Sequence, residues 1–171
     1  MGGADRQSVV LTEKLQSYGH EVKIVSLTRL GDMGVQAVRQ GLDIDSLQVR
    51  PGRIPFGKLA QLRRIVRSWR PSLIQGWMYH GNLAASLAGL FAHDSTPVTW
   101  GIRHSLYDLK EEKPLTRQVV RIGASLSGRA KVVIYNSQEA VKQHEQLGFD
   151  PTKSHVIPNG FDCDLYYPRK N

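Results

Sequence analysis

An arginine and a histidine stand side by side at Arg103 and His104, directly after a run of apolar residues that ends at Ile102. An arginine can hold an anionic group such as a phosphate, and a histidine can donate a hydrogen bond or a proton near neutral pH. Ser105 follows in the same loop. Surface hydrogen bonds alone would also explain such residues, but their place after a predicted strand favours a functional role.

Three further segments carry residues that could contact a ligand. Gly2 and Gly3 precede a helical pattern, and their bare backbone would let a ligand approach the amino terminus of that helix, although tight turns use glycine pairs too. His80 follows another predicted strand and could equally stack on the neighbouring tryptophan. Asn136 and Ser137 follow a third, where a helix cap is the more usual role.

Apolar runs and helical periodicities alternate along the chain and would bring these segments together. Strands are predicted at 21–27, 47–49, 72–78, 97–102, 131–135 and 155–157, and the first of them is expected to be buried on both faces. The predicted helices are one that ends at Gly19, 35–40, 57–70, 82–91, 115–126 and one between Ser137 and Gly148. This alternation is typical of a Rossmann-like, doubly wound parallel sheet, which binds ligands at the carboxyl ends of its strands.

Several kinds of site are missing from the sequence. There is no G-x-G-x-x-G dinucleotide motif and no G-x-S-x-G nucleophile motif, and His80 and His104 have no evident partner carboxylate or metal-ligand spacing. We therefore expect no bound metal. Cys163 is the single cysteine, the first residues are polar, and no apolar run approaches the roughly 20 residues of a membrane span, so a cytoplasmic location is expected.

The formal net charge of the 171-residue chain is +8, and basic residues crowd the segment from Arg50 to Arg70. A solvated helix face is the simplest interpretation of the predicted helix 57–70. Contact with an anionic membrane surface is a second, and nucleic-acid binding is the weakest, because the aromatic residues there form no stacking series. No nucleic-acid partner is expected.

Three motifs resemble a known family. They are Gly2-Gly3-Ala4-Asp5-Arg6-Gln7, then Gly19-His20-Glu21-Val22 before a buried strand, and Val156-Ile157-Pro158-Asn159-Gly160-Phe161-Asp162. Their order and spacing are similar to those of the amino-terminal half of the retaining GT-B glycosyltransferases of the group 1, or family 4, type, which include bacterial lipopolysaccharide and polysaccharide transferases. The resemblance covers essentially the whole chain, and the last motif is the most specific.

The resemblance implies an acceptor-side Rossmann-like domain at 1–162 and the start of an interdomain linker at 163–171. Pro158, Asn159 and Gly160 would form the hinge, with Pro158 ending a strand and the next two residues supplying a turn. His104 resembles the histidine that lies near the transferred sugar, His80 stands where another cleft residue is often found, and the glycine loop would approach the donor phosphates. The co-substrate would be a UDP- or GDP-sugar, with no tightly bound cofactor and no metal held by an Asp-x-Asp motif.

The sequence also departs from the family pattern. The first strand is missing, Asp5 replaces the usual glutamate, and the carboxyl-terminal donor-binding domain with its E-x7-E motif is absent. A fragment that is inactive alone is therefore expected, taken from a hexosyltransferase whose acceptor is a polysaccharide, a lipopolysaccharide or a lipid-linked, anionic molecule at the inner membrane face. Two alternatives are a non-enzymatic Rossmann-like binding module and a fragment of a GT-B sugar epimerase.

Overall fold

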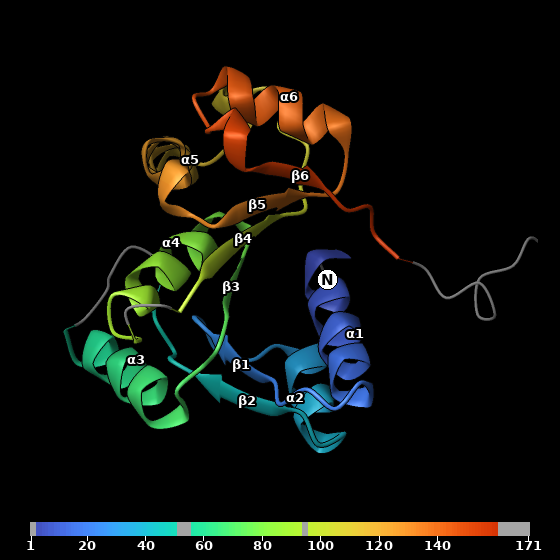
Figure 1. Cartoon of the computed structure of the whole chain (residues 1–171), viewed down its shortest axis with the longest axis vertical. Coiled ribbons are helices and arrows are strands. Elements are labelled where there is room, and N and C mark those ends of the chain that lie inside the picture. The colour runs from blue at the N-terminus through green and yellow to red at the C-terminus, as the bar shows by residue number, and fades with distance from the viewer. Residues whose placement is uncertain (1–2, 51–55, 94–95, 161–171) are drawn as a thin grey trace, which may run out of the picture.

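The computed structural model describes residues 3–50, 56–93 and 96–160 of the chain. Helices and strands alternate throughout (Figure 1). In chain order they are α1 (Gly3–Ser17), β1 (Lys23–Ser26), α2 (Asp32–Arg39), β2 (Asp43–Ser46), α3 (Phe56–Trp69), β3 (Ile74–Trp77), α4 (Met78–Gly89), β4 (Val98–Ile102), α5 (Pro114–Leu126), β5 (Val132–Tyr135), α6 (Gln138–Gln146) and β6 (Ser154–Val156), with short 3-10 helices at Leu109–Glu111, Ser127–Arg129 and Pro151–Lys153.

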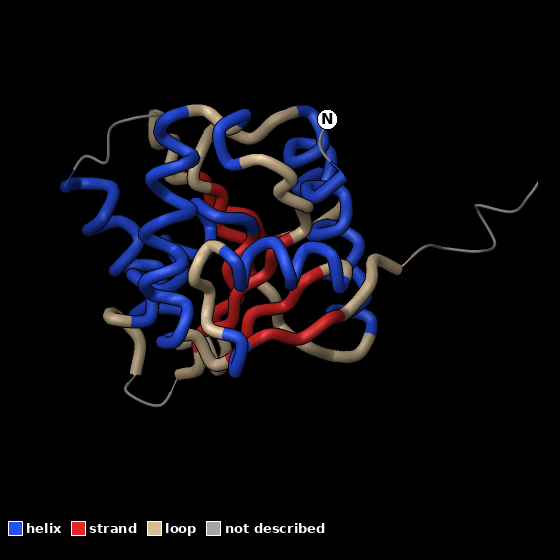
Figure 2. Tube along the Cα trace, turned by 90° about the horizontal axis from the view of Figure 1, so that it is seen from above, coloured by secondary structure: helices blue, strands red, loops and turns tan. Residues whose placement is uncertain are grey.

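All pairings between these strands are parallel, which confirms the predicted α/β class. The strands nevertheless form two sheets, one of β1 and β2 and one with the order β3-β4-β5-β6. Seen from above, the strands run through the middle of the molecule with helices at either side (Figure 2).

Several predicted boundaries also need correction. The second strand is Asp43–Ser46 and not 47–49, because these four residues pair in register with Lys23–Ser26 of β1. Lys23 also binds the carboxylates of Asp43 and Asp45 at 2.6 and 3.1 Å. The extended pairing continues beyond it, since the backbone of Leu47 still donates to the Ser26 carbonyl at 2.8 Å. Gly3 is the first residue of α1 and so lies in a helix, not in the predicted glycine loop.

Helix α4 begins at Met78, four residues before the predicted start at Asn82, so it follows β3 without a loop. Its packing on the sheet is very close. A Cβ added to Gly76 would lie 2.6 Å from the Asn82 Cα. The side-chain amide of Asn82 accepts a hydrogen bond from the Gly101 N–H at 3.2 Å and donates one to the Gly101 carbonyl at 3.3 Å. These contacts fix the carboxyl ends of β3 and β4 relative to each other.

The best-packed core lies on β4 and β5, where Trp100, Ile102, Val133 and Tyr135 are fully buried. By contrast, every residue of β1 is only half-buried. The prediction that this strand is buried on both faces is wrong, because β3 does not pair with it and leaves one of its sides without a strand partner among the described residues.

Candidate functional site

The carboxyl ends of β3, β4 and β6 meet around the side chain of Arg103, which follows β4. Its guanidinium lies 5.1 Å from the ring centre of Trp77 at the end of β3. Its Nη1 donates to the Ile157 carbonyl at 2.9 Å and to the Asn159 side-chain oxygen at 3.3 Å. Burial lowers the pKa of Arg103. Arg103 therefore binds the segment that leaves β6, and this Nη1 is not available as the anion-holding group that the sequence suggested.

Met78 occupies a conformation that is uncommon for a residue other than glycine. Its φ is +61°, in the left-handed region, at the junction where β3 becomes α4. The Arg103 backbone N–H donates to the Met78 sulfur at 3.3 Å, which helps to hold this turn. Strained backbone of this kind is found preferentially at functional sites, where the surrounding structure maintains it.

His104 is paired with a carboxylate, contrary to the expectation from the sequence. Its Nε2 lies 3.2 Å from Oε1 of Glu112, and the two side chains are 45% and 27% exposed. Glu112 directly follows the short 3-10 helix Leu109–Glu111 in the loop after β4. The nearby acidic pair Glu111-Glu112 was the signal available in the sequence, but nothing in its spacing showed that the chain folds back to His104.

Asn136 and Ser137 follow β5, the neighbour of β4 in the sheet. Because Ile102 is the register partner of Tyr135, the residues that follow them, Arg103 and Asn136, lie at adjacent positions on the edge. Asn136 Oδ1 and Arg103 Nε are both buried without a hydrogen-bond partner in the described part of the chain. The Ser137 hydroxyl accepts from the Ala140 N–H at 3.1 Å, so Ser137 caps α6 as the more usual interpretation held.

The remaining predicted site residues lie at or near the same edge. His80 is exposed in the first turn of α4, and Ser105 is partly buried after β4. Gln7, one turn into α1, donates to the Gly160 carbonyl at 3.2 Å, which brings the start of α1 and the predicted hinge together. Gly2 lies outside the described residues, and so do residues 161–171 with the proposed domain boundary at 162.

The predicted hinge, Pro158 to Gly160, is an extended segment and not a turn. The Ile157 N–H continues the β5 pairing by donating to the Tyr135 carbonyl at 2.9 Å, and residues 157–160 contain no assigned turn. Gly160 is not among the glycines with positive φ. Arg103 and Gln7 hold the segment from two sides, so its path is set by side-chain contacts and not by a turn at Asn159 and Gly160.

Beneath this edge lies a buried polar pair that the sequence did not indicate. The hydroxyl of Tyr79 in α4 is 2.8 Å from Nε2 of His144 in α6, and His144 is completely buried. The aromatic rings of Tyr135 and Phe149 lie 5.4 and 5.1 Å from the His144 ring. The pair connects α4 to α6 across β5, and burial raises the pKa of Tyr79 and lowers that of His144.

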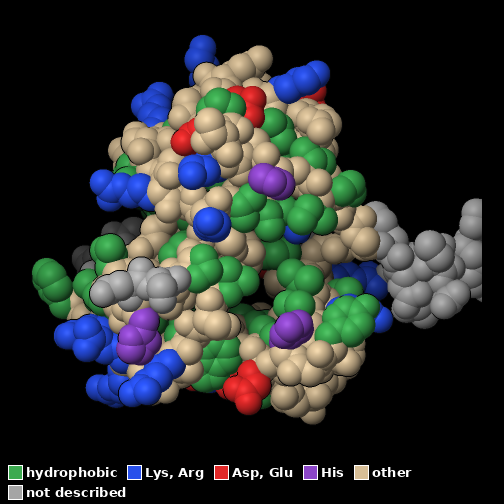
Figure 3. Space-filling view, viewed as in Figure 1, with side chains coloured by type: hydrophobic (Ala, Val, Ile, Leu, Met, Phe, Trp, Pro, Cys, Tyr) green, Lys and Arg blue, Asp and Glu red, His purple; other side chains and the backbone are tan. Residues whose placement is uncertain are grey.

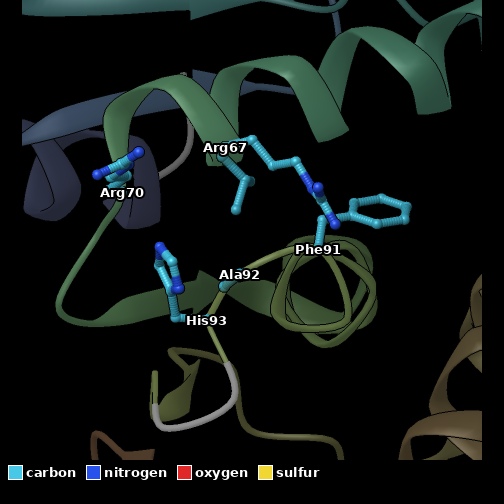
Figure 4. A pocket seen from close by; sticks show the side chains of 6 residues that line it. Arg67, Arg70, Phe91, Ala92 and His93 are labelled. Atoms are coloured by element: carbon cyan, nitrogen blue, oxygen red, sulfur yellow. The ribbon is translucent and has the colours of Figure 1, made fainter.

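Two pockets are found in the described part of the chain. The first, which we call the gap pocket, has a volume of about 580 Å³ and is lined by residues of α1, β1, α3, β3 and α4, among them Trp77, Met78 and His80 at the carboxyl edge. The space-filling view is hollowed near the middle of the face shown (Figure 3). The second pocket has about 470 Å³ and is formed by Arg67 and Arg70 at the end of α3 with Phe91, Ala92 and His93 after α4 (Figure 4). This second pocket lies at the amino ends of the strands, opposite the candidate site, because α3 ends just before β3 begins and α4 ends just before β4 begins.

Within residues 3–50, 56–93 and 96–160, no group of three or more His, Cys, Asp or Glu side chains is placed to hold a metal ion. No helix in these ranges is long and apolar enough to cross a membrane.

The sequence of residues 1–165 matches the family model for Glycosyltransferase Family 4. The chain belongs to this family. The match covers almost the whole chain, and it agrees with the family suggested by the three motifs. No functionally curated protein matches the sequence.

Solved structures show that this family 4 domain has the fold of one half of a GT-B protein. The structure of Anabaena Alr3699/HepE in complex with UDP and glucose is 20% identical with a TM-score of 0.74, over 96% of this chain and 43% of HepE. Its complex with UDP-glucose gives 19% identity and a TM-score of 0.76, over 97% of this chain and 43% of HepE. The domain thus spans less than half of the structures it matches.

UDP-N-acetylglucosamine 2-epimerases are also similar, with lower scores. The enzyme from Neisseria meningitidis, solved with UDP-GlcNAc bound, is 16% identical with a TM-score of 0.57, over 91% of this chain and 43% of the epimerase. The putative epimerase from Listeria monocytogenes has a TM-score of 0.55 at 16% identity, over 88% of this chain and 40% of that protein. At these identities the likeness concerns the fold alone.

Proposed function

We propose that this domain is the acceptor-side half of a retaining glycosyltransferase, which moves a hexosyl unit from a nucleotide-sugar to a hydroxyl group. The observation that carries the proposal is the His104–Glu112 pair, exposed at the carboxyl edge next to the Arg103 contacts with the segment leading to Gly160. Membership of family 4 supports the reaction class. The UDP and UDP-glucose complexes of HepE favour UDP as the nucleotide of the donor.

The chemistry available to His104 follows from its contact with Glu112. A carboxylate can only accept, so Nε2 carries the hydrogen that it donates to Oε1. Nδ1 has no hydrogen bond in the described part of the chain. In the neutral ring it accepts from a sugar hydroxyl, and in the protonated ring it donates to one. We propose that Glu112 positions the imidazole and that His104 contacts the transferred sugar.

In this proposal residues 1–162 form the domain, 163–171 begin the linker, and the polypeptide beyond supplies most of the donor contacts. Arg103 and Gln7 would set the direction in which the chain enters the second domain. Gly3, His80, Ser105 and Asn136 complete the cleft surface. The acceptor is a polysaccharide, lipopolysaccharide or lipid-linked molecule on the cytoplasmic side of the membrane, and the basic face of α3 would favour an anionic one.

The test uses the protein encoded by the complete reading frame that contains this domain, assayed for UDP release from a UDP-sugar in the presence of acceptor. We expect His104→Ala to lower kcat about a hundredfold, because a hydrogen bond that strengthens in the transition state is lost. Glu112→Ala should lower kcat by a smaller factor. Glu112→Gln should recover part of that loss, because its amide oxygen can still accept from Nε2.

His20→Ala is the matched control, because His20 is exposed beyond the other end of α1. Activity of His104→Ala equal to that of the control would overturn the assignment of His104. The 171-residue chain alone should show no turnover of a nucleotide-sugar. Measurable turnover by this chain would contradict the proposal that the second domain supplies most of the contacts with the donor.

A UDP-sugar epimerase is the second candidate, because solved epimerases share the fold. The two reactions separate when the complete protein is incubated with UDP-N-acetylglucosamine and no acceptor. A new UDP-sugar epimer without net release of UDP would indicate the epimerase. Release of UDP that depends on an added acceptor would indicate the transferase.

A further inference from the structure

The pocket at the amino ends of the strands gathers basic side chains around an apolar floor. Its volume of about 470 Å³ is in the range that holds small organic ligands, and its lining residues are Val66, Arg67, Arg70, Phe91, Ala92 and His93. They come from two segments, the end of α3 and the chain that follows α4 (Figure 4). None of these six residues is acidic, and α3 contains no acidic residue, so the charge around the pocket is positive.

The basic side chains of the pocket are available to an added anion. The structure describes no hydrogen bond or ion pair of the Arg67, Arg70 or His93 side chain with residues 3–50, 56–93 or 96–160. Each guanidinium carries five N–H donors in a planar fork, which fits two oxygens of a phosphate at once. Two such groups and an imidazole at one pocket therefore provide more donors than a single carboxylate could use.

The two sides of the pocket are tied together by Thr96. Its hydroxyl donates to the Pro71 carbonyl, next to Arg70, at 3.2 Å, and its backbone N–H donates to the His93 carbonyl at 2.9 Å. Arg70 has a φ of +51°, in the left-handed region at the end of α3, where glycine is the usual residue. Figure 4 shows the His93 imidazole pointing toward this end of α3. The backbone that carries Arg70 and His93 is thus held in place before any ligand binds.

The rest of the lining is apolar and belongs to the smaller of the two core clusters. Val66 is only 7% exposed, and Phe91 and Ala92 pack against the same cluster. Phe91 is half-buried, so part of its side chain remains accessible to a ligand, and Arg67 extends beside its ring (Figure 4). A ligand with an apolar or aromatic part would cover this surface, whereas an inorganic ion would use the basic groups alone.

We propose that this pocket binds a small organic phosphate. Arg67, Arg70 and His93 hold the phosphate group, and the remainder of the ligand packs against Phe91 and Ala92. A phosphate monoester carries close to two negative charges and three free oxygens, so it uses these donors better than a carboxylate does. The pocket lies opposite the edge at which sugar transfer is proposed, so this ligand is additional to the nucleotide-sugar.

The test titrates the 171-residue chain with phenyl phosphate and, separately, with inorganic phosphate at low salt, and follows the backbone amides by NMR. The pocket variant changes Arg67 and Arg70 together to Gln. The matched control changes Arg63 and Arg64 to Gln, which removes the same charge from the same helix at residues that do not line the pocket. All four arginines are exposed, so both variants should keep the fold.

We expect phenyl phosphate to shift the amides of Arg67, Arg70, Ala92 and His93 and to bind more tightly than inorganic phosphate. The pocket variant should weaken the binding of phenyl phosphate about tenfold or more, and the control by less than about twofold. Phe91→Leu should weaken phenyl phosphate about threefold and leave inorganic phosphate unchanged, because the substitution removes only the ring contact.

Three results would overturn the proposal. They are no binding of phenyl phosphate, equal weakening in the pocket variant and the control, and shifts that gather around Arg103 and His104 instead. A second arm measures sedimentation with phosphatidylglycerol vesicles. Vesicle binding that the pocket variant loses, in a chain that does not respond to phenyl phosphate, would assign the pocket to a lipid headgroup and would also overturn the proposal.

Discussion

His144 is completely buried against the main core, and its hydrogen bonds determine its charge. Nδ1 lies 2.6 Å from the Ala140 carbonyl, which can only accept, so Nδ1 carries the hydrogen. Nε2 then accepts from the Tyr79 hydroxyl at 2.8 Å. This arrangement uses the neutral ring fully. A second proton on Nε2 would point at the hydrogen of the Tyr79 hydroxyl, so the present hydrogen bond would be lost. It would also place a positive charge without a counter-charge next to the rings of Tyr135 and Phe149.

We therefore predict that the protein loses stability in mild acid. Burial lowers the pKa of His144 in the folded state, so the unfolded chain takes up this proton first as the pH falls. The contribution of neutral His144 to the free energy of unfolding is fully present above the ordinary histidine pKa of about 6.5 and is lost as the pH falls below it. The measurement is the free energy of unfolding by urea at a series of pH values from about 8 to 5.

His144→Leu should reduce this pH dependence, even if it lowers stability at neutral pH. His155→Gln is the matched control, because His155 is exposed on β6 and should leave the dependence unchanged. An unchanged slope in His144→Leu would show that other groups cause the acid sensitivity.

At the scale of the elements, the contact between α4 and the sheet positions the candidate site. Gly76 allows the helix to approach β3, and Asn82 joins the helix to β4 through the backbone N–H and C=O of Gly101. The left-handed Met78 then directs the start of α4 to the carboxyl edge. A substitution that pushes α4 away from β3 would move Trp77 and Met78, which both contact Arg103.

We predict that Gly76→Ala destabilises the protein by about 1–3 kcal/mol, because the new methyl group would lie 2.6 Å from the Asn82 Cα and the backbone would have to shift. Gly57→Ala is the matched control. Gly57 lies in α3 with nothing near an added Cβ, so alanine there should stabilise the protein by about 0.5–1 kcal/mol. The measurement is thermal or urea unfolding of both variants. Equal effects of the two substitutions would contradict the close approach of α4.

The features that could be predicted from the sequence are those that depend on local residues. α3 was placed within one residue at each end by its apolar spacing, Gly19 and Gly148 end helices with positive φ, and Ser137 caps α6. The features that were missed depend on residues far apart in the chain or on an unusual conformation. Met78 has no side-chain property that signals a left-handed turn, and neither His104–Glu112 nor Tyr79–His144 has a spacing that marks it as a pair.

At the scale of the whole molecule, Lys and Arg side chains are spread over the surface, and one group of them lies on α3. This group is seen at the lower left of the space-filling view, where Figure 1 places α3, and other Lys and Arg side chains lie over the upper part of the view (Figure 3). Arg63, Arg64, Arg67 and Arg70 are all exposed there, whereas Arg53 of the same basic stretch lies outside the described residues. The end of this face, at Arg67 and Arg70, borders the pocket at the opposite edge of the sheet from the candidate site.

We predict that changing Lys58, Arg63, Arg64 and Arg67 together to Glu abolishes sedimentation with phosphatidylglycerol vesicles at low salt, because the basic face is lost. The matched control changes Arg121, Arg129, Lys131 and Lys142 to Glu, which alters the net charge equally at exposed positions on other elements. The control should still bind the vesicles. Equal binding of both variants, or failure of the unmodified chain to bind, would exclude a membrane role for α3.

The order of the strands has a consequence for how the chain is made. β1 pairs with β2, and β3, β4, β5 and β6 pair in succession, so each pairing joins strands that are consecutive in the sequence. Such pairings close short stretches of chain and can form one after another as a polypeptide leaves the ribosome. The Gln7–Gly160 hydrogen bond joins residues 153 positions apart. It must therefore form late, so that α1 is fastened over the sheet only after the last strand has been added.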